Sequence, residues 1–180
     1  TSGEQFKFLA RGTYNRHIDY ELPNELRVTN SRFHEYDFKT AAGVEFQNFS
    51  SEIRYNYNLS RIGIPEELGE QNDHIALLAP FQRIDNHILS MHNHFYFKNS
   101  NLDVNIGYIA NNRKEFEEHH EEEEHEEEDG EHEEEHEEEE PELALHMKLK
   151  TITYDAKYHL PKIGKLETIL GIQGLYQENR

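Results

Sequence analysis

The stretch Ile53-Arg-Tyr-Asn-Tyr-Asn-Leu59 places an apolar or aromatic residue at every second position and a polar residue between them. Successive side chains of a β-strand point to opposite faces, so this period of two predicts a strand with one apolar and one polar face. Similar alternation recurs in six other stretches of the chain, at about 6–14, 33–46, 89–97, 102–108, 143–158 and 165–177. In 143–158 the apolar parity changes after Leu149, and we expect a β-bulge near Lys150 or Thr151. The sequence therefore predicts an all-β fold of about seven strands.

The connections between these strands alternate strictly between short and long. Short turns are expected near 47–51, 98–101 and 160–164, and long loops at 18–32, 61–82 and 114–142. In an antiparallel up-and-down meander this places every long loop at one end, as in outer-membrane barrels. Bacterial barrels close on an even number of strands starting at eight, so seven strands cannot close one. We therefore expect a transmembrane β-barrel segment that belongs to a larger barrel. The alternative is a soluble barrel or sandwich with its apolar face inside.

Charge is concentrated in one segment. Residues 115–142 hold 20 of the 37 acidic residues, five histidines and no Lys or Arg, which leaves 17 acids against 18 bases elsewhere. Nothing in this composition can build a packed core, so we expect 114–142 to be a disordered acidic loop. A polyanion repels phosphate, and no nucleic-acid partner is expected.

Imidazole mixed with carboxylate is a ligand set for Zn²⁺, Cu²⁺ or Ni²⁺, whereas oxygen ligands alone suit Ca²⁺ or Mg²⁺. The acidic loop supplies five candidate ligands, and an inert solvated polyanion would not need them. The second long loop adds the Asp73-His74 pair. His92 and His94 share one face of a strand, at the middle of that strand and with the polar parity, although simple polarity also explains them. The full set of candidate metal ligands is His119, His120, His125, His132, His136, Asp73, His74, His92, His94 and His146.

Three segments resemble TonB-dependent outer-membrane receptors, and within them the zinc-uptake subgroup. They are Tyr55-Asn-Tyr-Asn-Leu-Ser-Arg-Ile-Gly-Ile-Pro65, Pro80-Phe-Gln-Arg-Ile-Asp85 and Leu166-Glu-Thr-Ile-Leu-Gly-Ile-Gln-Gly-Leu-Tyr-Gln177, together with the His- and acid-rich loop. The resemblance covers residues 1–180 as a middle section of the barrel. It implies a 22-stranded barrel, an N-terminal plug domain and a TonB–ExbB–ExbD partner contacted through the plug, and this section contains neither the plug nor the contacting segment.

We therefore expect a non-enzymatic section of a receptor in the outer membrane of a Gram-negative bacterium, in contact with outer-membrane lipid. Its cargo is expected to be zinc, with copper or nickel as alternatives, captured by the extracellular loop 114–142. No catalytic constellation is present: His132-Glu-Glu-Glu-His136 has the spacing of a zinc-protease motif but lacks an apolar helix face. Two alternatives stay open. One is a soluble β-domain that buffers metal or binds cations, and the other is a TonB-dependent receptor for haem, a siderophore or a glycan.

Overall fold

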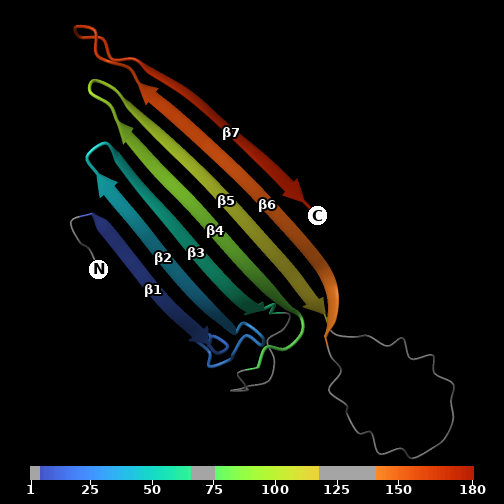
Figure 1. The fold of residues 1–180 in the computed structure, drawn as a ribbon. Helices are drawn as coiled ribbons and strands as arrows, with labels where there is room; N and C mark the ends of the chain where they lie inside the picture. The colour runs from blue at the N-terminus through green and yellow to red at the C-terminus, as the bar shows by residue number, and fades with distance from the viewer. Residues whose placement is uncertain (1–4, 66–75, 118–140) are drawn as a thin grey trace, which may run out of the picture.

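The computed structural model describes residues 5–65, 76–117 and 141–180 and contains β-strands joined by turns and loops (Figure 1). The described ranges confirm the predicted number of strands, and none of them holds a helix long and apolar enough to span a membrane. The last strand begins later than expected, because Ile163 and Leu166 pair across a small turn before it. The strands are β1 Phe6–His17, β2 Phe33–Phe46, β3 Phe49–Gly63, β4 Phe81–Tyr96, β5 Asn101–Glu117, β6 Glu142–His159 and β7 Ile169–Asn179.

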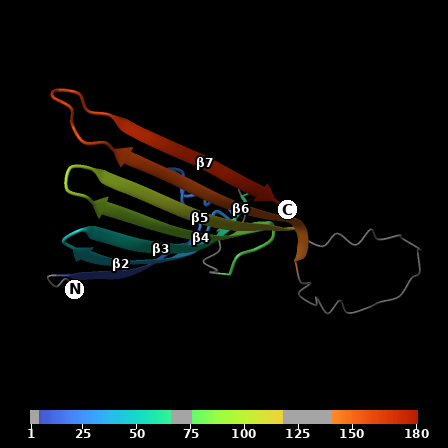
Figure 2. The same ribbon diagram turned by 45° about the horizontal axis from the view of Figure 1, so that its top comes forward.

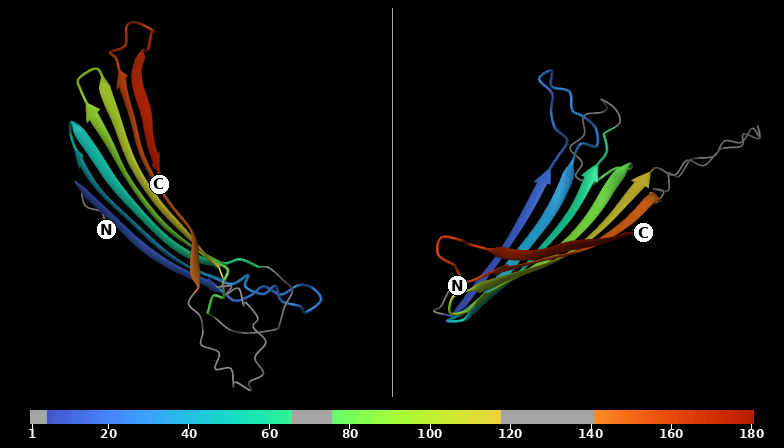
Figure 3. Two further views of the ribbon diagram at one scale, coloured as in Figure 1. Left: turned by 90° about the vertical axis from the view of Figure 1, so that its right-hand side faces the viewer. Right: turned by 90° about the horizontal axis from the view of Figure 1, so that it is seen from above.

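Each strand pairs antiparallel with its neighbours in sequence, which gives one sheet in the order β1 to β7. Figures 2 and 3 show this sheet as a single curved layer, with no second layer of described elements on either side. The sheet is open, with β1 and β7 at its two edges. Among the described residues, Val28 is the only buried hydrophobic one, and it lies in a loop. The described part of the chain therefore forms its strands without a hydrophobic core of its own.

The connections alternate as predicted. The turns at 47–48 and 97–100 and the segment 160–168 lie at one end of the sheet. The strand ends that border 18–32, 64–80 and 118–141 lie at the other end (Figure 1). We call these the short-turn end and the long-loop end. Because the strands follow one another up and down, every second connection returns to the same end of the sheet, and connections of the same kind therefore lie together.

The register of the strands sorts their side chains into two faces, because directly paired residues lie on the same face. One face, the apolar face, carries no Asp, Glu, Lys, Arg or His from the short-turn end to a border marked by residues such as Tyr14, Leu59 and Ile152. We call this uncharged region the apolar band. It consists of alternate residues of 6–14, 36–46, 49–59, 89–95, 102–108, 152–158 and 170–176. The opposite face, the polar face, carries charged and amide side chains over the same height.

The bulge expected near Lys150 or Thr151 was a wrong prediction. Pairing between β5 and β6 runs without a break through both residues, and the irregularity lies instead between Glu115 and Phe116. The parity change has another cause: Leu145, Met147 and Leu149 share the polar face, while His146, Lys148 and Lys150 share the apolar face beyond the band. The change marks where the apolar band ends on β6.

At the long-loop end, loops 18–32 and 64–80 are joined by side chains that reach the backbone of the other loop. Asn30 donates from Nδ2 to the carbonyl oxygens of Pro80 at 2.7 Å and Leu78 at 3.0 Å, and its Oδ1 accepts from the Leu78 amide at 3.2 Å. Asn30 has a φ of 58°, a left-handed conformation that Asn tolerates better than most residues. A Cβ on Gly63 would collide with Asn30, which explains a glycine at this close approach. We call this connection the loop clasp.

A buried ion pair completes the loop clasp. Arg32 donates from Nη2 to Asp19 Oδ2 at 2.6 Å and from Nε to Oδ1 at 3.1 Å, and its Nη1 reaches the Ala76 carbonyl at 2.8 Å. The two side chains are 2% and 4% exposed. Burial alone would raise the pKa of Asp19, but hydrogen bonds and the charge of Arg32 lower it overall below its ordinary value of 3.8. The guanidinium therefore holds two loops that are distant in sequence.

Candidate functional site

The polar face near the short-turn end holds the two predicted strand histidines. β4 lies between β3 and β5, and its register places His94 between Ser50 and Asp103. Its neighbour two residues earlier, His92, lies between Glu52 and Asn105. The shared face of His92 and His94 is confirmed, but both lie close to the end of β4 rather than at its middle, because β4 ends at Tyr96.

Asp103 links two histidines from different strands. Its Oδ1 contacts Nδ1 of His94, and its Oδ2 lies 3.1 Å from Nε2 of His159 on β6. All three side chains are about one-third exposed. A carboxylate that bonds one ring nitrogen of a histidine orients the ring and makes its other nitrogen a better metal ligand. The arrangement leaves Nε2 of His94 and Nδ1 of His159 as the nitrogens available for a ligand.

A second polar chain runs beside this one. Nδ1 of His92 lies 2.8 Å from Oδ1 of Asn105, and Asn105 donates from Nδ2 to Asp155 at 3.1 Å. The side-chain amide therefore orients His92 and is in turn held by a carboxylate. Both chains cross the strands, so backbone pairing positions every member.

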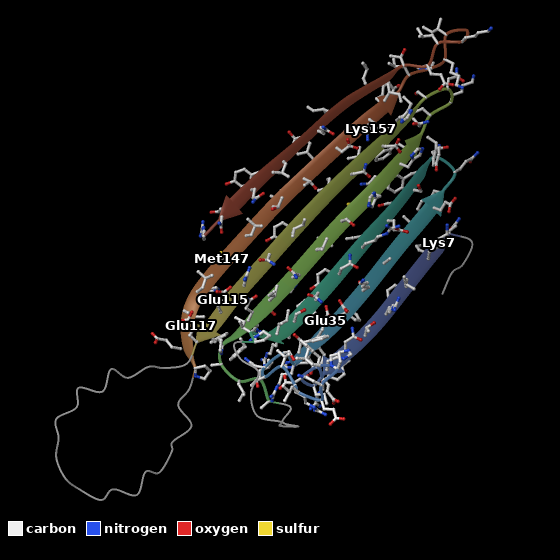
Figure 4. All side chains as sticks on the ribbon, turned by 180° about the vertical axis from the view of Figure 1, so that it is seen from behind. Lys7, Glu35, Glu115, Glu117, Met147 and Lys157 are labelled. Carbon is white, nitrogen blue, oxygen red and sulfur yellow. The ribbon has the colours of Figure 1, made fainter. Side chains whose placement is uncertain are left out.

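His92, His94, Asp103 and Asn105 from these two chains border a shallow depression of about 500 Å³ on the polar face. Its lining carries both signs of charge and includes Lys7, Glu45, Glu52, Arg54, His92, His94 and Asp103. In Figure 4, Lys7 and Lys157 mark the short-turn half of the sheet, and Glu35, Glu115 and Met147 lie toward the long-loop end. The depression offers a hydrated, polar surface and no enclosed apolar cavity.

His146, the third predicted ligand in the described ranges, does not join this site. It pairs with Lys114 on the apolar face, and its Nε2 lies 2.7 Å from Oδ1 of Asn112. The other predicted ligands, which are Asp73, His74, His119, His120, His125, His132 and His136, lie outside the described residues.

Within 5–65, 76–117 and 141–180, no group of three or more His, Asp or Glu side chains is placed to hold one metal ion. The polar face therefore presents paired, oriented imidazoles rather than a closed metal centre in its described part. The sequence analysis did not select Asp103 or His159. Asp103 has the polar parity of its strand, but the link to His159 depends on the register between β5 and β6, which no local pattern gives.

Comparisons with known proteins give no identification: no family model, no curated protein and no solved structure matches this chain.

Proposed function

We propose that this chain is a wall section of an outer-membrane β-barrel and that the barrel is a TonB-dependent receptor importing a metal ion, with zinc as the first choice. The observation that carries the proposal is the chemical division of one sheet. Its apolar band holds no charged side chain, and the polar face behind it holds charges and oriented histidines. A barrel wall with lipid on one side and water on the other requires this division.

The height of the apolar band supports a membrane setting. On β3 the band runs from Phe49 to Leu59, ten residue steps or about 33 Å along the strand at about 3.3 Å per residue. Strands of outer-membrane barrels tilt by about 35–45°, which reduces this length to a height of about 25 Å, the thickness of their apolar belt.

The large side chains of the band also favour lipid over a second protein layer. Ile106, Ile152 and Tyr176 are 47%, 45% and 64% exposed, and similar exposure runs across all seven strands. A soluble sandwich buries this face against another sheet. In the described part of the chain nothing covers it, so a bilayer is the medium that suits it.

Metal import is the function that the polar side chains suit best. The orienting contacts of His92, His94 and His159 leave ring nitrogens toward the interior of the proposed barrel. The acidic, histidine-rich loop would concentrate cations at the long-loop end by weak, exchangeable binding. Release and inward movement would depend on the plug and on the TonB–ExbB–ExbD complex, as in the family that the sequence resembles.

The test is metal binding and uptake by the intact barrel protein that contains this chain. Calorimetric titration with Zn²⁺, Cu²⁺, Ni²⁺ and Ca²⁺ is compared before and after deletion of residues 117–140, and we expect the number of bound transition-metal ions to fall. Unchanged stoichiometry would remove the loop from the proposal.

A matched pair of histidines on one strand tests the polar face. His94→Gln should reduce zinc uptake by cells that contain the receptor and the TonB–ExbB–ExbD complex, and His87→Gln, on the apolar face of β4, should not. Equal effects of the two substitutions would contradict a path along the polar face. A protein that is monomeric and folded without detergent would instead support the soluble, metal-buffering alternative.

A further inference from the structure

A row of cationic side chains crosses the apolar face on the long-loop side of the apolar band. Direct pairing aligns Arg16 with His34, Arg61, Arg83 and Lys114 over the strands β1 to β5. The row ends on β6 at His146, and Lys148 and Lys150 follow on the same strand and face. We call these eight residues the cation belt.

On four strands the cation belt lies directly at the border of the apolar band. Arg16 and Arg61 come two residues beyond the last band residues of their strands, Tyr14 and Leu59. On β6 the band stops earlier, at Ile152, and Lys150 occupies the next position on that face. On β4 and β5 the band ends at Leu89 and Tyr108, and the belt residues Arg83 and Lys114 lie six residues beyond these positions. The belt therefore adjoins the band on β1, β2, β3 and β6 and lies farther from it on β4 and β5.

The described part of the chain neutralises only a fraction of this charge. Arg83 pairs with Asp85 at 3.1 Å on the same face. No carboxylate among the described residues pairs with Arg16, Arg61 or Lys114. Like charges that face each other across strands are unfavourable. A chain with a net charge of −19 nevertheless places them together, and an anion from outside would relieve their repulsion.

We infer that the cation belt binds the phosphate groups of a lipid whose acyl chains lie on the apolar band. The inference rests on the proposed orientation of the sheet in a membrane. Arg and Lys are the side chains that recognise phosphate, by bidentate hydrogen bonds and by point charge respectively. The continuous apolar surface beside the belt distinguishes a phosphorylated lipid from a free anion, because only an amphiphile uses both regions.

The test compares two charge-removal variants of the intact barrel protein in detergent. The belt variant is Arg16→Gln/Arg61→Gln/Lys114→Gln. The control variant, Arg11→Gln/Lys39→Gln/Arg54→Gln, removes the same number of charges from the polar face. The probes are a lipid A bearing two phosphates, phosphatidylcholine and inorganic phosphate, with bound lipid measured by native mass spectrometry and titration. Heat-modifiable electrophoretic migration reports folding, and the single variants R16Q, R61Q and K114Q provide the same readout if the triple variant does not fold.

We expect the wild-type protein and the control variant to prefer the phosphorylated lipid over phosphatidylcholine by at least about tenfold, and the belt variant to lose this preference. Equal binding of the phosphorylated lipid to the belt and control variants would overturn the inference, as would displacement of the lipid by millimolar inorganic phosphate. Loss of lipid preference with zinc uptake intact would leave the proposed function standing. A wild-type protein that does not enter bilayers would overturn both.

Discussion

The loop clasp and the apolar band differ in how far their side chains are buried. In the loop clasp, Arg32 and Asn30 are 1% and 4% exposed, and their polar atoms are satisfied by Asp19 and by the backbone of the other loop. In the apolar band, residues such as Phe6 and Ile172 are 63% and 64% exposed, and within the described ranges they have no covering layer. Among the described residues, the polar groups of the clasp have their partners, and the apolar side chains of the band have no cover.

The loops and the strands of this sheet are therefore held in place by different interactions. Charge-assisted hydrogen bonds in a buried site hold the loops wherever the protein is placed. The strands have their backbone ladder, but their apolar side chains gain free energy only when another apolar medium removes them from water. The order of the clasp should therefore be insensitive to the surrounding medium, and that of the band should depend on it.

The largest effect is expected from breaking the loop clasp. Arg32→Ala leaves the Asp19 carboxylate buried without its partner and should lower the free energy of unfolding by about 3–5 kcal/mol. The measurement is urea unfolding in detergent. Lys162→Ala, which removes an exposed contact with Glu167 in the segment 160–168, is the control and should cost far less. Similar losses for the two variants would contradict the special role of the buried pair.

A charge placed on each face of β4 tests the apolar band. Met91→Arg puts a guanidinium in the band and should destabilise the protein in a bilayer by about 2–4 kcal/mol, the cost of Arg near the midplane of a barrel. Ile88→Arg puts the same charge on the polar face of the same strand, opposite Asn56 and Ile109, and should have little effect. The two variants are compared by unfolding from lipid vesicles. If Met91→Arg proved neutral, the band would face water.

A smaller effect is expected from acid. Because Arg32 lowers the pKa of Asp19 below 3.8, the stability that Asp19 contributes is fully present above that pH and is lost as pH falls through the lowered pKa. The difference in urea midpoint between wild type and Asp19→Asn should be constant from pH 7 to about pH 5 and should shrink as pH approaches 3. A difference that grows in acid would reverse the sign of this linkage. The effect is smaller than that of Arg32→Ala because a protonated Asp19 can still accept hydrogen bonds from Arg32, and the contact of Arg32 with the Ala76 carbonyl remains.

The strands and the order of their connections were predictable because both depend on local pattern. The alternation in 53–59 is visible in seven residues, and turn lengths follow from the gaps between such stretches. The loop clasp was not predictable, because Asn30 and Leu78 are 48 residues apart and nothing near either one indicates the other. The β-bulge was misplaced because the sequence pattern shows only where the apolar residues change parity. On β6 they change parity because the apolar band ends there, and no bulge is needed. His159 was missed for a similar reason, since register between strands brings it to Asp103.

The most direct test of the central claim uses the absence of cysteine from these 180 residues. Single cysteines are introduced at positions 88–93 of β4 in the proposed intact barrel, labelled with an environment-sensitive fluorophore and reconstituted into vesicles containing brominated lipid. The account predicts quenching at 89, 91 and 93, which belong to the apolar band, and accessibility to an aqueous quencher at 88, 90 and 92. Uniform accessibility to water at all six positions, or quenching with the opposite parity, would contradict it.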